Sequence, residues 1–219
     1  MMNVRVFYTK TGRARFISHL DMMRFMTRAL KRSGLPVWYT EGFNRHIYTT
    51  FALPLSLGFE SQCEFMDFRL LPDEFDMQEV ADRLNACLTP DIQIKAAAPV
   101  GMDPKGITWA DFRITFWAQQ ESDALQQAFR NFCAQSEIVV EKKTKRSLST
   151  VDIAPLMELL DTAFSDENAT ADLRLAAGNT MNINPNLVLQ AFWQHSGLEP
   201  VPVQVMRLRV LDKDFQDFA

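Results

Sequence analysis

Residues 14–36 read ARFISHLDMMRFMTRALKRSGLP, and this stretch predicts an amphipathic helix. Ser18 followed by Asp21 is a capping-box-like start, and Gly34 with Pro36 predicts a firm end. At roughly 100° per residue, the apolar side chains share one face and the cations share the opposite one. The apolar face holds Met22, Met23, Phe25, Met26, Ala29 and Leu30, and the cationic face holds Arg24, Arg28, Lys31 and Arg32.

The segments around this helix contain five strand candidates and a second helix, and taken coarsely they predict a β-α-β-β-α-β order, which is that of a ferredoxin-like unit. The strands are expected where residues alternate or are rich in β-formers, and the second helix follows a Pro-Asp pair. The expected strands are 4–10, 37–41, 47–53, 63–71 and 92–100, and the second helix is 76–88. We assign this first domain to residues 1–100.

The second half repeats the order less clearly, after a joint near residues 99–109. Asn184-Pro185 predicts the N-cap and first turn of its last helix, and Gly197 predicts the end. An insertion around residues 147–165 interrupts the pattern, and 149–164 fits either a strand or a short helix. The other expected strands are 110–118, 137–146, 169–177 and 201–211, and the helices are 121–135 and 186–197. The predicted class is therefore α+β, with two tandem ferredoxin-like units and antiparallel sheets, the second at 108–219.

Composition is that of an ordinary soluble globular protein, with 47% hydrophobic and 23% charged residues among 219. No apolar run approaches a membrane span, and the first residues lack the apolar core of a signal peptide. Cys63, Cys87 and Cys133 are odd in number and scattered, which favours a reducing cytoplasm over a disulfide framework. Their spacing also excludes an iron–sulfur cluster held by this chain alone. We therefore expect a cytoplasmic protein without a membrane partner and without a cofactor.

Charge is segregated along the chain. Residues 1–50 contain nine Lys or Arg and two acids, so they carry +7 while the whole chain carries −4. A segregated positive field indicates a polyanionic partner. The alternative is that positive and negative surfaces pair within the fold.

Two basic clusters are candidate RNA contacts. Four cations on one helical face repel one another unless counter-ions such as phosphates are present. A second cluster lies at a predicted strand end, where a basic hairpin could clamp an RNA backbone. Either cluster could instead be a solvated surface. The second cluster consists of Lys142, Lys143, Lys145 and Arg146.

The histidines allow a catalytic or metal-binding reading. His19 or His46 could serve as general acid or base in RNA cleavage. His19, however, falls on the apolar side of the helix, where a packed neutral imidazole is commoner. With Asp21 the two histidines offer at most three metal ligands, without a close His pair. We expect no metal site and assign no catalytic residue.

Residues 42–58, GFNRHIYTTFALPLSLG, combine a constrained turn with polar side chains. Gly42 permits a left-handed backbone, and Asn44 tolerates one. Arg45 and His46 are expected at a loop or strand edge, where with Asn44 they form a candidate contact site. Expected core anchors are Phe43, Ile47, Phe51 and Leu53, with Tyr48 facing out.

These residues, over about 4–70, resemble the radical-SAM-linked family of uncharacterised bacterial proteins, whose members stand alone or extend a radical SAM protein at its C-terminus. Arg45 departs from the pattern, since the family usually has Pro there and often Pro-Lys in place of Ile47-Tyr48. The matching positions are Ser18-His19-Leu20-Asp21, Arg24, Arg28, Arg32, Gly42-Phe43-Asn44, His46, Phe51 to Leu55, Gly58 and Glu60-Ser61.

The resemblance implies a working relationship with a radical SAM enzyme whose iron–sulfur cluster lies on the partner chain. Because many such enzymes modify RNA, the expected function is a non-catalytic RNA-binding or accessory module presenting tRNA or rRNA, an argument by analogy of fold. One alternative is a subunit that docks a radical SAM partner through its basic face. Another is a metal-independent endoribonuclease that uses His19 or His46.

Overall fold

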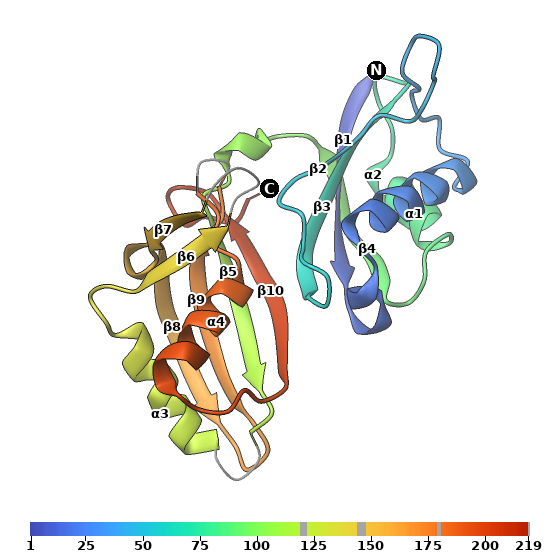
Figure 1. Cartoon of the computed structure of the whole chain (residues 1–219). Helices are drawn as coiled ribbons and strands as arrows, with labels where there is room; N and C mark the ends of the chain where they lie inside the picture. Colours follow the sequence, from blue (N-terminus) through green and yellow to red (C-terminus); the bar gives the residue numbers. More distant parts are fainter. Residues whose placement is uncertain (119–121, 144–147, 179–180, 219) are drawn as a thin grey trace. The chain divides into compact units, whose positions relative to one another are not determined.

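The computed structural model describes residues 1–118, 122–143, 148–178 and 181–218, and the chain divides into two compact units (Figure 1). The first unit covers Met1–Pro104 and the second covers Lys105–Phe218. Each unit combines helices with an antiparallel sheet, so the protein is of mixed α+β class.

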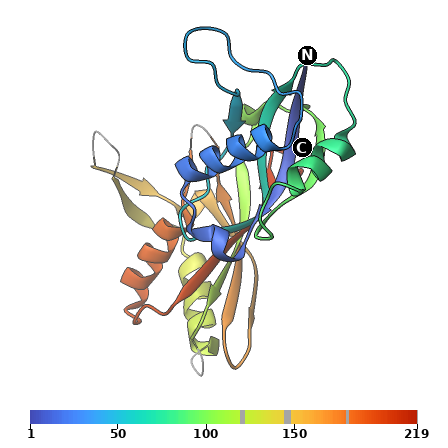
Figure 2. The same ribbon diagram turned by 90° about the vertical axis from the view of Figure 1, so that its right-hand side faces the viewer.

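The first unit has the element order β-α-β-β-α-β. Its strands lie side by side in the order β4-β1-β3-β2, and all three neighbouring pairs are antiparallel. Figures 1 and 2 show both helices on one face of this sheet. The elements are β1 (Met2–Lys10), α1 (His19–Arg32), β2 (Thr49–Phe51), β3 (Glu60–Leu70), α2 (Met77–Asn85) and β4 (Ile92–Pro99).

Local capping signals set the helix boundaries of the first unit. Ser18 is the N-cap of α1, as predicted, and its side chain accepts a hydrogen bond from the Asp21 backbone N–H. Gly34 follows the helix with a φ of 69°, a conformation that glycine adopts without strain. Asp76 caps α2 in the same manner. The core between sheet and helices contains Val4, Val6, Met22, Met26, Leu30, Met66, Phe68, Val80 and Leu84.

The prediction of a strand at residues 37–41 is wrong. Val37 and Tyr39 make only isolated bridges, to Leu70 and Ile47. Pro36 and the turn after α1 shorten the extended segment, so that it cannot form a continuous ladder of hydrogen bonds with a neighbouring strand. The strand expected at 47–53 is reduced to β2, because Leu53 has a φ of 49° and Pro54 follows.

The second unit repeats the strand arrangement of the first. Its sheet has the order β10-β5-β9-β8, again with antiparallel neighbours. The Asn184 side chain caps α4, and Gly197 ends that helix with a φ of 67°, both as predicted. The elements are β5 (Trp109–Phe116), α3 (Ser122–Cys133), β8 (Met157–Phe164), β9 (Ala169–Ala176), α4 (Pro185–Ser196) and β10 (Val203–Leu211).

A two-stranded hairpin is inserted between α3 and β8. It consists of β6 (Val139–Lys143) and β7 (Leu148–Asp152), which pair with each other and form a sheet of their own. The strand expected at 137–146 therefore exists but does not join the main sheet of its unit. Residues 154–156, after β7, form a single 3-10 turn before β8 begins.

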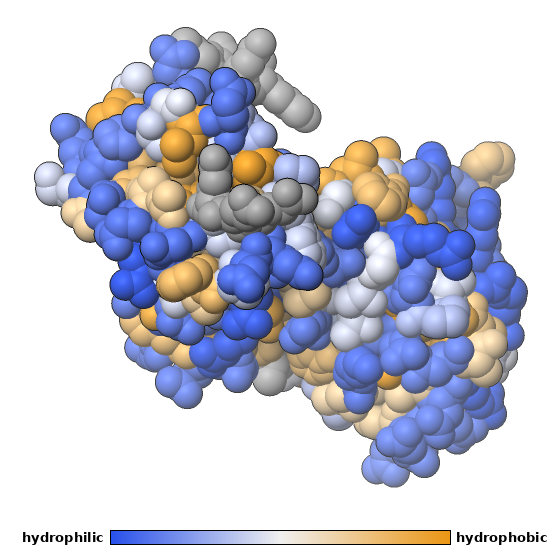
Figure 3. All heavy atoms as spheres, turned by 90° about the horizontal axis from the view of Figure 1, so that it is seen from below, coloured by the Kyte–Doolittle hydropathy of each residue, from blue (hydrophilic) through white to orange (hydrophobic). Residues whose placement is uncertain are grey.

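Aromatic side chains fill the space between the second sheet and its helices. The rings of Phe129 and Phe192, from α3 and α4, pack at 4.9 Å between centroids in a T-shaped arrangement. Phe116 of β5 contacts both rings. On the face drawn in Figure 3, hydrophobic residues are scattered in small groups among hydrophilic ones. Among the described residues, no helix has the length and apolar character that a bilayer span requires.

Candidate functional site

The basic face of α1 consists of Arg24, Arg28, Lys31 and Arg32, and all four side chains are exposed. The opposite side of the helix is buried in the core of its unit, as the sequence pattern predicted. The amphipathic helix therefore presents its cations to solvent, because the apolar side already faces the sheet.

Two of these cations have partners within the unit. Arg24 forms an ion pair with Asp21 one turn earlier, with Nη1 and Oδ1 at 3.1 Å. Arg32 donates from Nη2 to the Cys87 carbonyl oxygen at 2.7 Å. For Arg28 and Lys31 the structure records no ion pair with any described residue. These two cations are thus available to an external anion.

The start of α1 is held by a reciprocal pair. The Ser18 hydroxyl donates to Asp21 Oδ2 at 2.8 Å and accepts from the Asp21 backbone N–H at 3.2 Å. The hydrogen bond from Ser18, followed by that from Arg24, holds the pKa of the Asp21 carboxyl below its usual 3.8. Ser18 and Asp21 of the sequence motif therefore have a structural role at this helix end.

Residues 40–46 form a closed loop, which we call the 40–46 loop. Two hydrogen bonds close the base of the loop. The Thr40 backbone N–H donates to the His46 carbonyl oxygen at 2.8 Å, and the His46 backbone N–H donates to Thr40 Oγ1 at 3.1 Å. The His46 ring also lies 3.0 Å from the Asn44 carbonyl oxygen. Figures 1 and 2 both show this loop extending away from the body of its unit. Gly42, at its tip, has a φ of 111°, which only glycine adopts readily.

The 40–46 loop exposes Asn44, Arg45 and His46, as expected for a contact site. The expectation that Phe43 anchors the core is wrong, because its side chain is fully exposed. Ile47, which was also expected as a core anchor, is 2% exposed and begins the return toward β2, so this part of the prediction is confirmed. Tyr48 faces out, as predicted.

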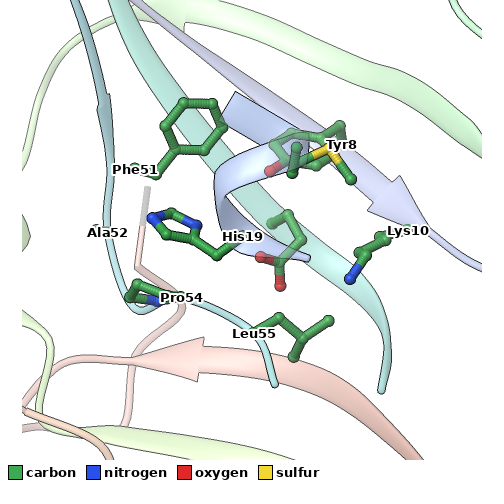
Figure 4. Close-up of a pocket in the computed structure, with 9 residues that line it drawn as sticks. Tyr8, Lys10, His19, Phe51, Ala52, Pro54 and Leu55 are labelled. Carbon is green, nitrogen blue, oxygen red and sulfur yellow. The ribbon is translucent and has the colours of Figure 1, made fainter. Parts of the chain in front are cut away.

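A small pocket opens at the start of α1 (Figure 4). The His19 ring stands between Phe51 and Pro54, and its centroid lies 5.8 Å from that of Phe51 in an edge-to-face contact. His19 is half-buried at the first helical position, in agreement with its place on the apolar side. The remaining lining comes from Tyr8, Lys10, Met22, Ala52, Leu55 and Glu64.

Lys10 and Glu64 are polar pocket residues that the pattern of the sequence did not single out. Both are nearly buried, and the Lys10 ammonium donates to the Ile17 carbonyl oxygen at 2.9 Å. Glu64 stands opposite Tyr8 across β1 and β3. The sequence did contain an indication that these two residues are special. Each charged residue occupies a core-facing position in a strand whose other core-facing residues are mostly apolar.

The pocket combines an ammonium, a carboxylate, a phenol and an imidazole, which are groups capable of proton transfer. Its cavity volume is about 10 Å³, however, which is about the space that one water molecule needs. It can hold a water but no substrate of nucleotide size. In the part of the chain that the structure describes, no group of three His, Cys, Asp or Glu side chains is placed to hold a metal ion.

Two residues of the second basic cluster lie on the inserted hairpin. Lys142 and Lys143 belong to β6, opposite Ser149 and Leu148 of β7. Lys145 and Arg146 lie outside the described residues.

Comparison with solved structures finds the fold of this chain elsewhere. A chain of a Cbf5-Nop10-Gar1 complex matches with a TM-score of 0.50 at 10% identity, over 94% of this chain. The present chain spans only 48% of that chain, and the likeness concerns the fold alone. An unknown protein from Galdieria sulphuraria matches 94% of this chain and 98% of its own at 14% identity, with a TM-score of 0.27 that is too low for a comparison of folds.

Comparison with curated proteins finds no relative of this chain. A family profile, in contrast, matches residues 3–185, which include all of the first unit's strands and helices and most of those of the second. The coarser part of the resemblance seen in the sequence is thereby confirmed: the chain belongs to a family described as uncharacterized protein conserved in bacteria, DUF2344.

Proposed function

We propose that this protein is a non-catalytic RNA-binding module built from two tandem ferredoxin-like units. The supporting observation for the fold is that both sheets place the last strand beside the first, then the third and the second. Each unit also follows a β-α-β-β-α-β order once the β6-β7 hairpin is set aside.

The observation that carries the RNA-binding proposal is the basic face of α1. Arg28 and Lys31 are exposed, point away from the core and have no recorded acidic partner among the described residues. Exposed cations on a rigid helix suit the phosphate backbone of a structured RNA, because each contact releases condensed counter-ions. We assign supporting contacts to Arg24 and Arg32 of α1. We assign further contacts to Asn44, Arg45 and His46 of the 40–46 loop and to the second basic cluster.

We further propose that the module works with a radical SAM enzyme and presents tRNA or rRNA to it. The support is the motif match around Ser18-His19-Leu20-Asp21 and Gly42-Phe43-Asn44. Cys63, Cys87 and Cys133 lie on β3, shortly after α2 and at the end of α3, and none of the three forms a disulfide. The cluster of such an enzyme would accordingly be held by the partner chain.

The test is binding of bulk bacterial tRNA over a salt series of roughly 50 to 200 mM. The Arg28→Ala/Lys31→Ala variant is compared with Lys95→Ala/Lys213→Ala, which removes two exposed cations outside α1. We expect wild type to bind with a steep salt dependence. The α1 variant should lower the slope of log K against log salt by roughly 0.7 to 0.9 per cation, and the control should leave it unchanged.

Three outcomes are informative. Absence of binding by wild type at low salt contradicts the proposal, and the basic face is then examined as a docking surface for an acidic protein. Equal losses in both variants show that overall charge, not the α1 face, attracts the RNA, and they also contradict it. Loss confined to the α1 variant supports it.

A further inference from the structure

Phe43 is displayed in an unusual manner. Its side chain is fully exposed at the tip of the 40–46 loop, although phenylalanine is a residue that folding normally buries. The other phenylalanines of the first unit are less exposed, including Phe16 at 64%. A phenyl ring in water forgoes the stabilisation that burial of its apolar surface would bring.

The loop holds this ring on a constrained backbone. Hydrogen bonds between Thr40 and His46 close its base, and the His46 ring contacts the Asn44 carbonyl within the loop. The buried side chain of Ile47 anchors the chain where it leaves the loop and runs toward β2. Because the loop is already closed, binding a partner at its tip requires less ordering than binding through an open segment.

The residues around Phe43 in the loop are charged and polar. Glu41 and Arg45 each lie two residues away and are exposed, and no ion pair is recorded for Arg45 with a described residue. Asn44 and His46 are exposed as well. An aromatic ring with a cation nearby is the combination by which proteins bind single-stranded nucleic acid, since the ring stacks on a base while the cation meets the backbone.

We infer that Phe43 is a stacking platform for an unpaired RNA base and that Arg45 contacts an adjacent phosphate. This inference rests on the proposed function and deepens it, because it defines the substrate class as RNA with an unpaired segment. A paired base cannot serve, since its faces are already covered by neighbours in the helix. Sequence-tolerant binding is expected, because every base has a π-face.

The test compares two labelled RNAs with the same number of phosphates, an unstructured oligouridine and a fully paired, blunt-ended duplex, by fluorescence anisotropy. Phe43→Ala should weaken binding of the oligouridine by roughly fivefold to a hundredfold and leave binding of the duplex unchanged. Phe43→Trp should restore or strengthen oligouridine binding. Phe164→Ala removes another exposed phenyl ring, from β8 of the second unit, and serves as the matched control.

The outcomes separate this inference from the proposal beneath it. If wild type binds neither RNA, both fail. If wild type binds but Phe43→Ala matches it on both RNAs, only the stacking inference fails. If Phe43→Ala weakens the binding of both RNAs equally, Phe43 does not stack on an unpaired base, and the inference is again overturned.

Discussion

Arg5 and Asp67 face each other across β1 and β3 and form a bidentate ion pair. The Arg5 Nε lies 2.8 Å from Asp67 Oδ1, and its Nη2 lies 2.9 Å from Oδ2. Arg5 is 1% exposed, and its guanidinium also donates to the Met102 carbonyl and lies over the Phe65 ring. One of the nine cations in residues 1–50 is therefore used inside the fold and contributes nothing to a surface contact.

Removal of Asp67 is expected to destabilise the first unit strongly. Asp67→Asn leaves the buried Arg5 charge without its carboxylate, which costs about 3–5 kcal/mol. Urea unfolding measures the change. Asp214→Asn is the control, because Asp214 pairs with Lys213 on the surface and such pairs contribute about 0–1 kcal/mol. Equal effects of the two substitutions would contradict the structural role of the Arg5–Asp67 pair.

The Asp21 carboxylate is expected to make stability depend on pH at the acidic end. Hydrogen bonds from Ser18 and Arg24 lower its pKa in the folded protein below 3.8. Its contribution is therefore fully present above the unfolded pKa and is lost as pH falls through the lowered folded value. Asp21→Asn should flatten the loss of stability below about pH 4 relative to wild type. Thermal unfolding between about pH 2 and 6 measures the pH dependence of stability in both proteins. An identical dependence would show that the hydrogen bonds of the Asp21 carboxylate contribute nothing to stability.

Cys133 is expected to be inert toward alkylation in the folded protein. Burial raises the pKa of its thiol from 9.0 to about 12, so the reactive thiolate is scarce at pH 8. Labelling with iodoacetamide followed by mass spectrometry should show Cys133 modified slowly in buffer and rapidly in urea. A Cys133 that reacts in buffer as fast as in urea would contradict its partial burial at the end of α3.

We expect that His19 takes no part in RNA cleavage. Its ring packs edge-on to Phe51 in a pocket of about 10 Å³, a setting that leaves no room for a ribose. RNA incubated with wild type, His19→Ala or His46→Ala should remain intact on a denaturing gel. Cleavage by wild type that one of the variants abolishes would establish the endoribonuclease alternative in place of the non-catalytic module.

Features with local causes could be predicted from the sequence. Helix α1 was expected where it occurs because Ser18 can cap it and Gly34 can end it, and its cationic face is exposed as the 3.6-residue period requires. The same applies to Asn184 and Gly197 at the ends of α4. Capping and turn conformations involve residues close in sequence, so their signals survive without knowledge of the fold.

Features that depend on distant partners could not be predicted. Phe43 was assigned to the core because it is apolar. Whether an apolar side chain is buried depends on which elements reach it, and none of the described elements covers this loop tip. The short extended segment around Val37 and Tyr39 likewise makes only isolated bridges, to Leu70 of β3 and to Ile47. Local β propensity therefore predicted a strand that the available ladder did not complete.

The amino-acid sequence alone predicted the amphipathic helices, the caps of α1 and α4, most of the strands and the concentration of positive charge in the first 50 residues. The distribution of that charge between interior and surface depended on the fold. Strand pairing buries Arg5 against Asp67 and Lys10 beside the Ile17 carbonyl, whereas α1 leaves Arg28 and Lys31 in solvent. Charge is carried by single residues, whereas burial is set by contacts between segments far apart in the chain.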